Sequence, residues 1–423
     1  MSTVVHLRWD SSSAGPSRND KQSCVYDAYI PDPLGGRSFM LDGQVAADIS
    51  DAEAAISRLN AQATSLVDTE ALARILLRAE SVASSRIEGL QIGARRLLRA
   101  EAARELGVSP SDVTALEVLS NIDAMVFGVQ SVDAGDPIGV ELLHNIHRRL
   151  VEGTRLEKYG GTFRDEQNWI GGSDYNPCSA TYVPPPPKYV EDMMVDLCAF
   201  SSTDDLPAVA QAAIAHAQFE TIHPYVDGNG RTGRALIHLI LRRRGLAPRI
   251  VPPISLILAT WAKSYVEGLT AFRYVGEPIS SEALTGLNTW VGRFASACTR
   301  SVDDATAFEQ KALAIETEWR ERLGRVRAKS ATDLLLRLLV GAPVVNVNSA
   351  AKLIDVSFVN TNHAVTRLVE AGILKQITEG KRNRAFEAPE IIAAFTDLER
   401  QLASPEGDTK TSKPARGAPQ RRQ

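Results

Sequence analysis

One short stretch in the middle of the chain brings together side chains that can carry out phosphate chemistry. It reads His223-Pro-Tyr-Val-Asp-Gly-Asn-Gly-Arg-Thr-Gly-Arg234. A histidine can act as a general base, an aspartate can bind Mg²⁺, glycines let the backbone approach an anion, and arginines present guanidinium forks to phosphate oxygens. Phosphoryl or nucleotidyl transfer requires this combination, whereas a structural core does not.

The second half of the stretch is expected to bind a nucleotide. Gly228 and Gly230 let the backbone come close to phosphate, and Asn229 tolerates a left-handed conformation while its amide donates a hydrogen bond. Arg231 and Arg234 lie about one helical turn apart, so both guanidiniums can reach along one polyphosphate. The expected nucleotide-binding residues are Gly228, Asn229, Gly230, Arg231, Thr232, Gly233 and Arg234.

The first half of the stretch supplies the expected metal ligand and the expected base. Asp227 would repel the phosphates unless a cation lay between them, so we assign it to Mg²⁺. His223 is the remaining ionisable group. Since an unperturbed histidine has a pKa of about 6.5, its neutral imidazole can accept a proton from an attacking hydroxyl at cellular pH.

Helices must flank this loop for a helix N-terminus to face the anion. An alanine-rich run from Pro207 to about residue 221 predicts a buried helix before the loop. The run from Thr232 to Arg244, which ends at Gly245, predicts a second buried helix after it. Further helices are expected over 49–63, 68–83, 91–105, 110–127, 139–152, 255–273 and 281–325, the last of them broken near Ser301.

Two segments depart from the helical pattern. Residues 1–43 are rich in Ser, Gly, Pro and Asp and are expected to form an extended arm. Residues 159–187 are dense in Gly, Asn, Asp and Pro and contain short β-like runs, which predicts a β-hairpin.

The C-terminal part shows a different order of elements. Helical patterns over 334–339, 348–354 and 359–371 precede short strand patterns over 373–377 and 384–386, an order typical of a winged helix. The predicted fold is therefore mainly α, a helical bundle with a β-hairpin flap and a small C-terminal winged-helix domain. The expected parts are an N-terminal arm with helices over 1–110, a catalytic domain over 111–328, the winged helix over 329–400 and a disordered basic tail over 401–423.

Composition places the chain among ordinary globular proteins. It has 423 residues, 44% of them hydrophobic and 23% charged, with a net charge of −4. Its cysteines, Cys24, Cys178, Cys198 and Cys298, form no C-x-x-C pair, which favours reduced thiols over a disulfide framework or zinc site. The N-terminus lacks the pattern of a secretory signal and no long apolar run occurs, so we expect a cytoplasmic protein without membrane contact.

The stretch His223–Arg234 closely resembles the signature of the Fic family, H-x-F-x-(D/E)-G-N-G-R-x-x-R. Tyr225 replaces the usual phenylalanine, which packs under the loop in the family, and its hydroxyl therefore needs a partner. Residues 143–150, Gly161-Thr-Phe-Arg164 and the segment 169–187 resemble the family helix and flap that surround the signature. His144 and His147 have the spacing of metal ligands on a helix, but no third ligand accompanies them, so core or surface positions are expected.

The resemblance implies a reaction. A Ser, Thr or Tyr hydroxyl of a target protein, or of the enzyme itself, is deprotonated by His223 and attacks the α-phosphate of Mg·ATP, so that AMP is transferred and pyrophosphate leaves. The chain would then be a protein adenylyltransferase. The intact Gly-Asn-Gly-Arg core argues against the phosphorylating Doc branch of the family, while removal of AMP at the same site stays open as an alternative.

A second motif resembles the inhibitory motif of the family, (S/T)-x-x-x-E-(G/N). It reads Ser84-Ser-Arg-Ile-Glu88-Gly89 and follows a predicted helix upstream of the signature, as in N-terminally inhibited members. The resemblance implies that Glu88 pairs with Arg234 and keeps the γ-phosphate out of its productive position. A carboxylate and a phosphate compete for the same guanidinium fork, so such a brake is physically reasonable. Ser84 is expected to help fix the arrangement.

The expected partners follow from the other segments. The flap over 159–187 would hold a segment of the target protein by strand addition. The alternative function is that of a DNA-binding regulator, which would use the winged helix with the catalytic domain as modulator. Its candidate contacts are Asn360, Asn362, His363, Thr366 and Arg367 on the recognition helix and Lys381, Arg382 and Arg384 in the wing. A winged helix can equally serve protein contacts, including a homodimer.

Overall fold

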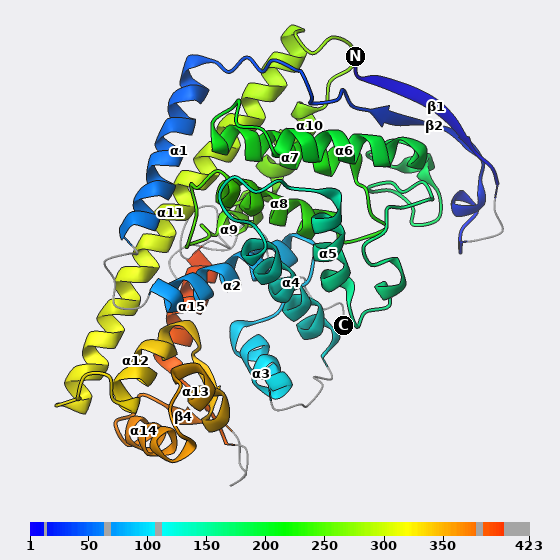
Figure 1. The fold of residues 1–423 in the computed structure, drawn as a ribbon. Coiled ribbons are helices and arrows are strands. Elements are labelled where there is room, and N and C mark those ends of the chain that lie inside the picture. The colour runs from blue at the N-terminus through cyan, green and yellow to red at the C-terminus, as the bar shows by residue number, and fades with distance from the viewer. Residues whose placement is uncertain (12–14, 63–68, 106–111, 378–383, 402–423) are drawn as a thin grey trace, which may run out of the picture. The chain divides into compact units, whose positions relative to one another are not determined.

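The computed structural model describes residues 1–11, 15–62, 69–105, 112–377 and 384–401 (Figure 1). These residues fold into two compact units that interleave along the chain. The first unit contains Met1–Ala54, Asp123–Pro248 and Lys263–Ser296, and the second contains Ala55–Ile122, Arg249–Ala262 and the described residues from Ala297 onward. The predicted division into consecutive parts over 1–110, 111–328, 329–400 and 401–423 stays a prediction, and residues 402–423 of the basic tail lie outside the described residues.

Helices dominate the first unit. Its strands are β1 (Thr3–Trp9) and β2 (Cys24–Ile30), and its helices are α5 (Val140–Val151), α6 (Val190–Ser201), α7 (Ala208–Ile222), α8 (Asn229–Arg243) and α10 (Ala262–Phe272). Helices α1 (Gly43–Gln62), α4 (Val113–Gln130) and α11 (Ser281–Leu323) belong partly to it. Short 3₁₀ turns are η1 (Asn19–Lys21), η2 (Glu157–Tyr159), η3 (Pro177–Ser179) and η4 (Pro187–Tyr189).

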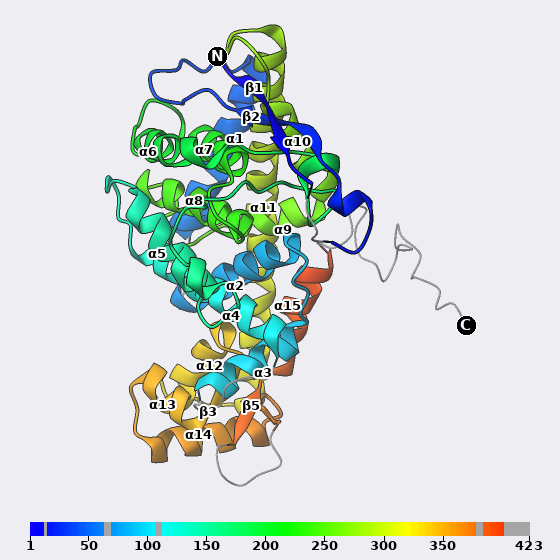
Figure 2. The same cartoon turned by 90° about the vertical axis from the view of Figure 1, so that its right-hand side faces the viewer.

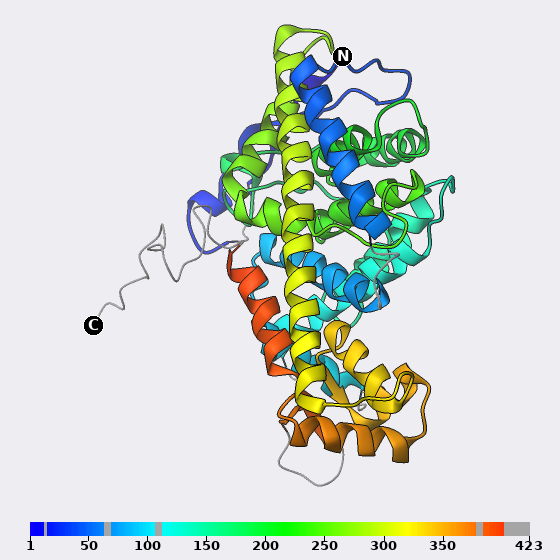
Figure 3. The same ribbon diagram turned by 90° about the vertical axis from the view of Figure 1, so that its left-hand side faces the viewer.

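The second unit is also mostly helical. Its own helices are α2 (Thr69–Ile87), α3 (Ala94–Glu105), α9 (Ile254–Thr260), α12 (Ala331–Gly341), α13 (Val347–Ile354), α14 (Phe358–Glu370) and α15 (Pro389–Gln401). Figure 3 shows α15 alongside the C-terminal part of α11, where the Trp319 indole donates a hydrogen bond to Glu390 and Lys311 pairs with Asp397 at 3.0 Å.

Helices α7 and α8 form the core of the first unit and lie side by side (Figure 1). Every residue of α7 is buried. Alanines make its surface smooth, and Gly233 of α8 lies so close to it that a Cβ would come within 2.8 Å of Phe219 and 2.7 Å of Glu220. The Trp290 indole of α11 donates to the Ala213 carbonyl at 2.7 Å and closes the packing from another side. The two buried helices predicted on either side of the loop are thus confirmed.

The N-terminal arm is extended, as expected, but its strands pair. Strands β1 and β2 form an antiparallel ladder in which Thr3 faces Ile30 and Trp9 faces Cys24 (Figure 2). A disulfide joins Cys24 of β2 to Cys178. The expectation of reduced thiols is therefore wrong for this pair, because the fold brings together cysteines 154 residues apart. Cys198 and Cys298 are free and buried.

Several expected helix boundaries change in the structure. The expected helix over 255–273 is divided into α9 and α10 by a turn at Trp261. The expected break near Ser301 is absent, since α11 continues from Ser281 to Leu323 and the Ser301 hydroxyl donates to the Cys298 carbonyl at 2.7 Å within the helix. Helices α6 and α15 have no counterpart in the sequence-based expectations.

The expected hairpin over 159–187 is reduced to a single antiparallel bridge between Ile170 and Tyr182. The Ile170 N–H donates to the Tyr182 carbonyl at 2.8 Å, and the Thr181 N–H returns to Ile170 at 2.8 Å. Strand β2 lies against the second arm of this segment, where the Tyr29 N–H donates to the Val183 carbonyl at 3.0 Å. The disulfide and this bond hold β2 beside the second arm, which is the part of the segment from Tyr182 onward.

The C-terminal elements follow the expected order. Helices α12, α13 and α14 precede β4 (Lys375–Gln376) and β5 (Ala385–Glu387), and β3 (Val344–Asn346) completes a described sheet of order β3-β5-β4. Figure 2 shows β3 and β5 beside these helices. The winged-helix assignment itself stays a prediction. DNA binding also stays a prediction. Two of its candidate contacts bond within the chain, since Arg367 donates to the Leu323 and Arg325 carbonyls and Arg384 donates to Asn362.

The remaining candidate DNA contacts are only partly visible. Asn360, His363 and Thr366 are exposed on α14, while Lys381 and Arg382 lie outside the described residues. The first residues of α14 are apolar and exposed, Phe358 by 53% and Val359 by 61%.

Within the described residues, no helix combines the length and apolar character needed to cross a bilayer. The cytoplasmic location stays a prediction.

Candidate active site

His223 ends α7 in an unusual backbone conformation. Its φ of 51° and ψ of 62° lie in the left-handed region, and its N–H closes the helix by donating to the Phe219 carbonyl at 2.8 Å. A non-glycine residue in this region carries backbone strain that the surroundings must offset. Its imidazole Nδ1 lies 3.9 Å from the Glu220 carboxylate, and the side chain is 20% exposed. A partly exposed imidazole is thus held at the end of a buried helix.

Arg164 offsets the strain at this helix end. Its Nε donates to the His223 carbonyl at 2.9 Å, and its Nη2 donates to the Pro185 carbonyl at 2.5 Å and the Ile222 carbonyl at 3.3 Å. Only 3% of Arg164 is exposed, and burial lowers the pKa of its guanidinium to about 10. The terminal carbonyls of a helix lack intrahelical donors, and a cation is favoured beside them. Arg164 therefore fixes the backbone that carries His223.

Asn229 closes the loop between α7 and α8. Its side-chain oxygen accepts from the Tyr225 N–H at 2.7 Å, and its amide donates to the Tyr225 carbonyl at 2.8 Å. Asn168 donates to the same carbonyl at 3.1 Å. The Asn229 side chain is therefore engaged within the loop, and the left-handed conformation expected of Asn229 is found at Gly228, with φ of 76°. Nucleotide binding by Asn229 stays a prediction.

Tyr225 packs under the loop and is fully buried. Its ring stacks on His147 with centroids 3.8 Å apart. Its hydroxyl lies 3.2 Å from Nδ1 of His144, which is the partner that the sequence required. Burial raises the pKa of Tyr225 far above its usual range, so the phenol stays neutral.

His147 connects this loop to the segment that leads into the flap. The Gly161 N–H donates to its Nδ1 at 3.0 Å, so the proton lies on Nε2, which donates to the Asp227 carbonyl at 2.9 Å. Burial lowers the pKa of His147 to about 4. The described residues contain no cluster of three or more metal-ligating side chains. Both ring nitrogens of His147 bind backbone groups and the residue is 1% exposed, so it is a core residue that positions Asp227.

The loop leads into the N-terminus of α8, the expected phosphate site. Gly228 is the N-cap, and a Cβ there would come within 2.9 Å of Leu150. The N–H of Thr232 and its hydroxyl both donate to the Gly228 carbonyl at 3.0 Å. Both bonds run to the residue four positions earlier, so the Thr232 side chain is engaged within the first turn of α8 and does not cap it. The first-turn N–H groups of Asn229, Gly230 and Arg231 form the end that favours an anion.

The signature arginines are more buried than the sequence suggested. Arg231 is 6% exposed and Arg234 only 1%. Arg234 lies close enough to His216 to lower its pKa, although burial is the larger cause. A polyphosphate can therefore reach the Arg234 guanidinium only after the atoms that cover it have moved.

Asp227 is exposed at the tip of the loop. One carboxylate oxygen accepts from the Gly228 N–H at 2.5 Å, and within the described part of the chain the other accepts no hydrogen bond. Protein-bound Mg²⁺ commonly uses one or two carboxylates together with substrate phosphates and water. An exposed carboxylate beside a helix N-terminus fits this use, so the residues present are compatible with Mg²⁺.

The candidate inhibitory segment ends α2. The Gly89 N–H donates to the Arg86 carbonyl at 3.0 Å and the Leu90 N–H to the Ser85 carbonyl at 3.0 Å, the bond pattern of a Schellman motif. Glu88 is then the C-cap, and Gly89 has a φ of 82°. Glu88 is exposed and Ser84 is buried. A carboxylate at a helix C-terminus is unfavourable by about 0.3–1 kcal/mol, so the stability of α2 does not explain Glu88.

The neutral histidines make stability depend on pH. Burial lowers the pKa of His147 to about 4 and that of His216 to about 3, whereas both titrate near 6.5 when unfolded. Their contribution to stability is complete above pH 6.5 and is lost as pH falls toward the folded pKa. For His147 we expect the free energy of unfolding to be lower by about 2 kcal/mol at pH 5 than at neutral pH.

Chemical denaturation at pH 7 and pH 5 checks this expectation. His147→Gln can still donate to Asp227 and accept from Gly161 but does not titrate. Between pH 7 and pH 5 the free energy of unfolding of this variant should fall by about 2 kcal/mol less than that of the wild type, because only His216 and other groups still contribute. Equal losses in the two proteins would contradict the assignment of His147 as a buried neutral histidine.

The first unit is an α-helical bundle that contains the pair α7 and α8 and the loop between them. On this loop His223 lies four residues before Asp227, the candidate Mg²⁺ ligand, and the N-terminus of α8 follows directly. Two known family models match parts of the chain. Residues 137–241 match the Fic/DOC family, and residues 46–130 match the Fic/DOC family N-terminal segment. Two segments of the chain therefore match the two family models of Fic/DOC proteins, and the signature loop lies inside the first of them.

Two curated proteins are similar to part of this chain. The protein adenylyltransferase fic-1 of Caenorhabditis elegans is 29% identical over 157 residues, which cover 37% of this chain and 29% of that protein. The protein adenylyltransferase Fic of Drosophila willistoni is 35% identical over 118 residues, or 27% of this chain and 22% of that protein. The chain thus spans less than a third of the length of these relatives.

A solved structure supports the fold over most of the chain. The crystal structure of a Fic family protein from Desulfovibrio desulfuricans is similar with a TM-score of 0.51 at 18% identity, and the match covers 83% of this chain and 97% of that one. This similarity concerns the fold alone.

Sequence reasoning missed how the loop is supported. Arg164 and Asn168 hold the His223 and Tyr225 carbonyls, and His147 holds Asp227. The available signals were indirect: an arginine inside a glycine-rich segment and a histidine on the apolar side of a helix. Neither pattern indicates which backbone carbonyl the side chain will bind.

Proposed function

We propose that this protein transfers AMP from Mg·ATP to a Ser, Thr or Tyr hydroxyl of a target protein and of itself. The loop geometry carries the proposal. A left-handed His223 ends one buried helix and a left-handed Gly228 begins the next. The general-base candidate and the anion-binding helix end therefore lie on one short loop, as attack on a bound phosphate requires.

The residues of the loop support each step of this reaction. His223 accepts the proton of the attacking hydroxyl, whose oxygen forms a bond to the α-phosphorus as the bond from that phosphorus to the bridging oxygen breaks. Pyrophosphate leaves with the electron pair of that bond. The first turn of α8 and Arg231 stabilise the negative charge on the phosphates. Arg164 keeps His223 in place throughout, because its guanidinium binds the backbone and not the imidazole.

Asp227 would hold Mg²⁺ through the carboxylate oxygen that does not bind Gly228. Bound there, the ion would neutralise phosphate charge and orient the leaving group. The chain's own contribution is the position of Asp227, which His147 fixes through the Asp227 carbonyl. The relatives' name, protein adenylyltransferase, supports ATP as the substrate.

Glu88 acts as a brake in this proposal by pairing with Arg234 in place of the γ-phosphate. Two observations support it. Glu88 stands at the C-cap of α2, where a carboxylate weakens the helix. Arg234 is almost completely buried, so it is inaccessible to a polyphosphate from solvent. A brake explains why an unfavourable carboxylate is kept at this position.

The segment 159–187 is the proposed docking site for an extended segment of the target. Strand β2 already lies beside its second arm through the Tyr29–Val183 bond and the Cys24–Cys178 disulfide. Strand addition would therefore use the first arm, which leads to Ile170 and carries backbone groups not paired with β2.

Labelled ATP tests the reaction class. The full-length protein is incubated with Mg²⁺ and ATP labelled at either the α- or the γ-phosphate, and protein-bound label is measured after electrophoresis. We expect label from the α-phosphate only. Label from the γ-phosphate would show phosphotransfer and reject AMP transfer. The Glu88→Gly variant serves as the high-signal sample, and absence of label from it would also reject the proposal.

A further inference from the structure

A half-open pocket in the second unit has features of a small-molecule site. It lies between α2, α12 and α13 and has a volume of about 170 Å³. Its wall is apolar on one side and charged on the other. The lining residues are Glu70, Ala71, Arg74, Leu334, Arg337, Leu338, Leu353 and Ile354. A cavity of about 150 Å³ lined by aliphatic side chains accommodates benzene, so this pocket has room for one small ring or a branched chain.

Arg337 has donor capacity that the protein does not use. Its Nε is buried without a hydrogen-bond partner, and its Nη2 donates to Asp333 over a long 3.3 Å. Asp333 is shared, since it also accepts from Arg320 at 2.8 Å and from the Lys329 N–H at 2.9 Å. The Arg337 side chain as a whole is 30% exposed, so the exposed part of its guanidinium can donate a charge-assisted hydrogen bond to a carboxylate ligand.

Arg74 adds a second cation at the mouth of the pocket. It pairs with Glu70 at 2.5 Å, but the Glu70 side chain is 77% exposed. Exposed ion pairs contribute little to stability, so Arg74 can turn toward a bound anion at low cost. A ligand with one negative charge matches this wall, whereas a cation would meet both guanidiniums.

The wall between α2 and α12 is preformed. A Cβ on Gly341 of α12 would come within 2.6 Å of the Cα and carbonyl oxygen of Ala71 in α2, so the two backbones touch. Leu338 is almost fully buried, while Leu353 is 44% exposed at the rim. A preformed apolar wall lowers the cost of ordering a ligand.

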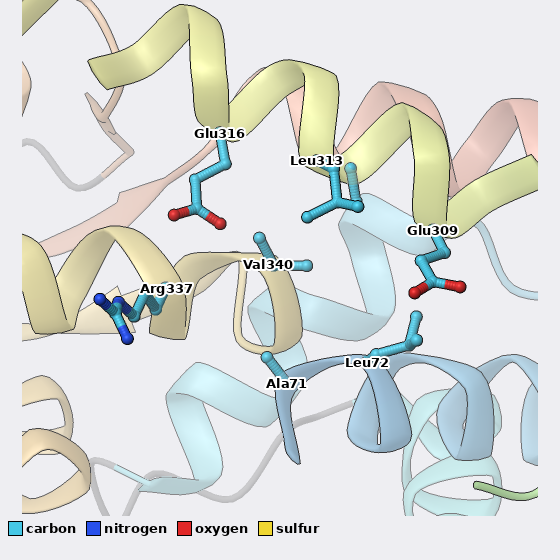
Figure 4. A pocket seen from close by; sticks show the side chains of 8 residues that line it. Ala71, Leu72, Glu309, Leu313, Glu316, Arg337 and Val340 are labelled. Atoms are coloured by element: carbon cyan, nitrogen blue, oxygen red, sulfur yellow. The ribbon is translucent and has the colours of Figure 1, made fainter. Parts of the chain in front are cut away.

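A second cavity, which also borders Ala71 and Arg337, is too small to be the site. It has a volume of about 30 Å³. Figure 4 shows Glu309, Leu313 and Glu316 on α11 facing Ala71 and Leu72 on α2, with Val340 between them. That volume is about the space of one water molecule, so no organic ligand fits there.

We propose that the larger pocket binds a small monocarboxylate with a compact apolar body. The carboxylate would accept hydrogen bonds from Arg337, and the body would lie on Leu334, Leu338 and Ile354. Benzoate is the simplest aromatic probe of this chemistry, and 3-methylbutanoate is the aliphatic one. Benzamide has the shape of benzoate without its charge.

Binding to the full-length protein is measured by saturation-transfer NMR and isothermal titration. We expect benzoate or 3-methylbutanoate to bind at least about tenfold more tightly than benzamide, since a charge-assisted hydrogen bond contributes at least that factor. Arg337→Met should remove this preference. Arg322→Met is the matched control, because Arg322 has a similar exposure and pairs with Glu390 at 2.6 Å outside the pocket. It should leave binding unchanged.

A second variant keeps the test valid if Arg337→Met fails to fold. Leu353→Asp places a negative charge at an exposed rim position, and we expect it to weaken carboxylate binding at least tenfold without loss of folding. The proposal is overturned if neither carboxylate binds, if benzamide binds as tightly as both, or if the folded Arg337 and Leu353 variants bind them as the wild type does.

Discussion

We expect the substitution His223→Ala to abolish AMP transfer, including self-modification. General-base catalysis contributes roughly a factor of 10² to 10⁴, so transfer should fall to background. The measurement is the rate at which label from the α-phosphate enters protein. ATP binding should remain, because the anion site at α8 does not depend on the imidazole.

A backbone effect has to be separated from the loss of the base. His223 has a φ of 51°, and alanine in the left-handed region is destabilised by about 1–2 kcal/mol. His223→Asn is the matched variant, since asparagine tolerates this region but cannot act as the base. Both variants should be inactive. Transfer that survives in a folded His223→Asn protein would reject the base assignment.

We expect the substitution Glu88→Gly to raise the rate of AMP transfer. Removal of a charge-assisted pair of about 1.5–3 kcal/mol would raise the rate roughly 10- to 100-fold, because Arg234 becomes available to the γ-phosphate. Glu88→Gln removes the charge while it keeps the shape, so it should raise transfer as well. The rate of self-modification with labelled ATP is the measurement.

Stability provides the control for this result. The carboxylate lies at the C-terminal end of α2, so Glu88→Gln should leave the free energy of unfolding unchanged or raise it by up to about 1 kcal/mol. The double variant Glu88→Gly with His223→Asn should be inactive, which would show that the added activity uses the same site. Equal rates of AMP transfer by the wild type and both Glu88 variants would contradict the hypothesis that Glu88 inhibits the site.

Most of the helical framework was predictable because its signals are local. The alanine-rich run before the loop and the apolar run after it predict α7 and α8 to within a few residues. The break expected near Ser301 failed because a serine in a helix can bond back to its own turn, as Ser301 does to Cys298. The hairpin of residues 1–43 was missed because strand pairing depends on contacts between distant residues.

The amino-acid sequence by itself determined the chemistry of the loop. From His223 to Arg234 the base, the carboxylate, the glycines and the arginines are contiguous, so their order alone predicts a helix N-terminus that binds phosphate. Gly89 is a comparable local signal, since a glycine after a helical pattern predicts the left-handed turn that ends α2.

Only the tertiary structure decided how these groups are held. The partners of His223 and Asp227 are Arg164 and His147, which lie 59 and 80 residues away in the chain. The disulfide between Cys24 and Cys178 spans 154 residues. Contacts over such separations leave no periodic or spacing pattern in the sequence, because they arise when helices and loops pack and buried donors find carbonyls.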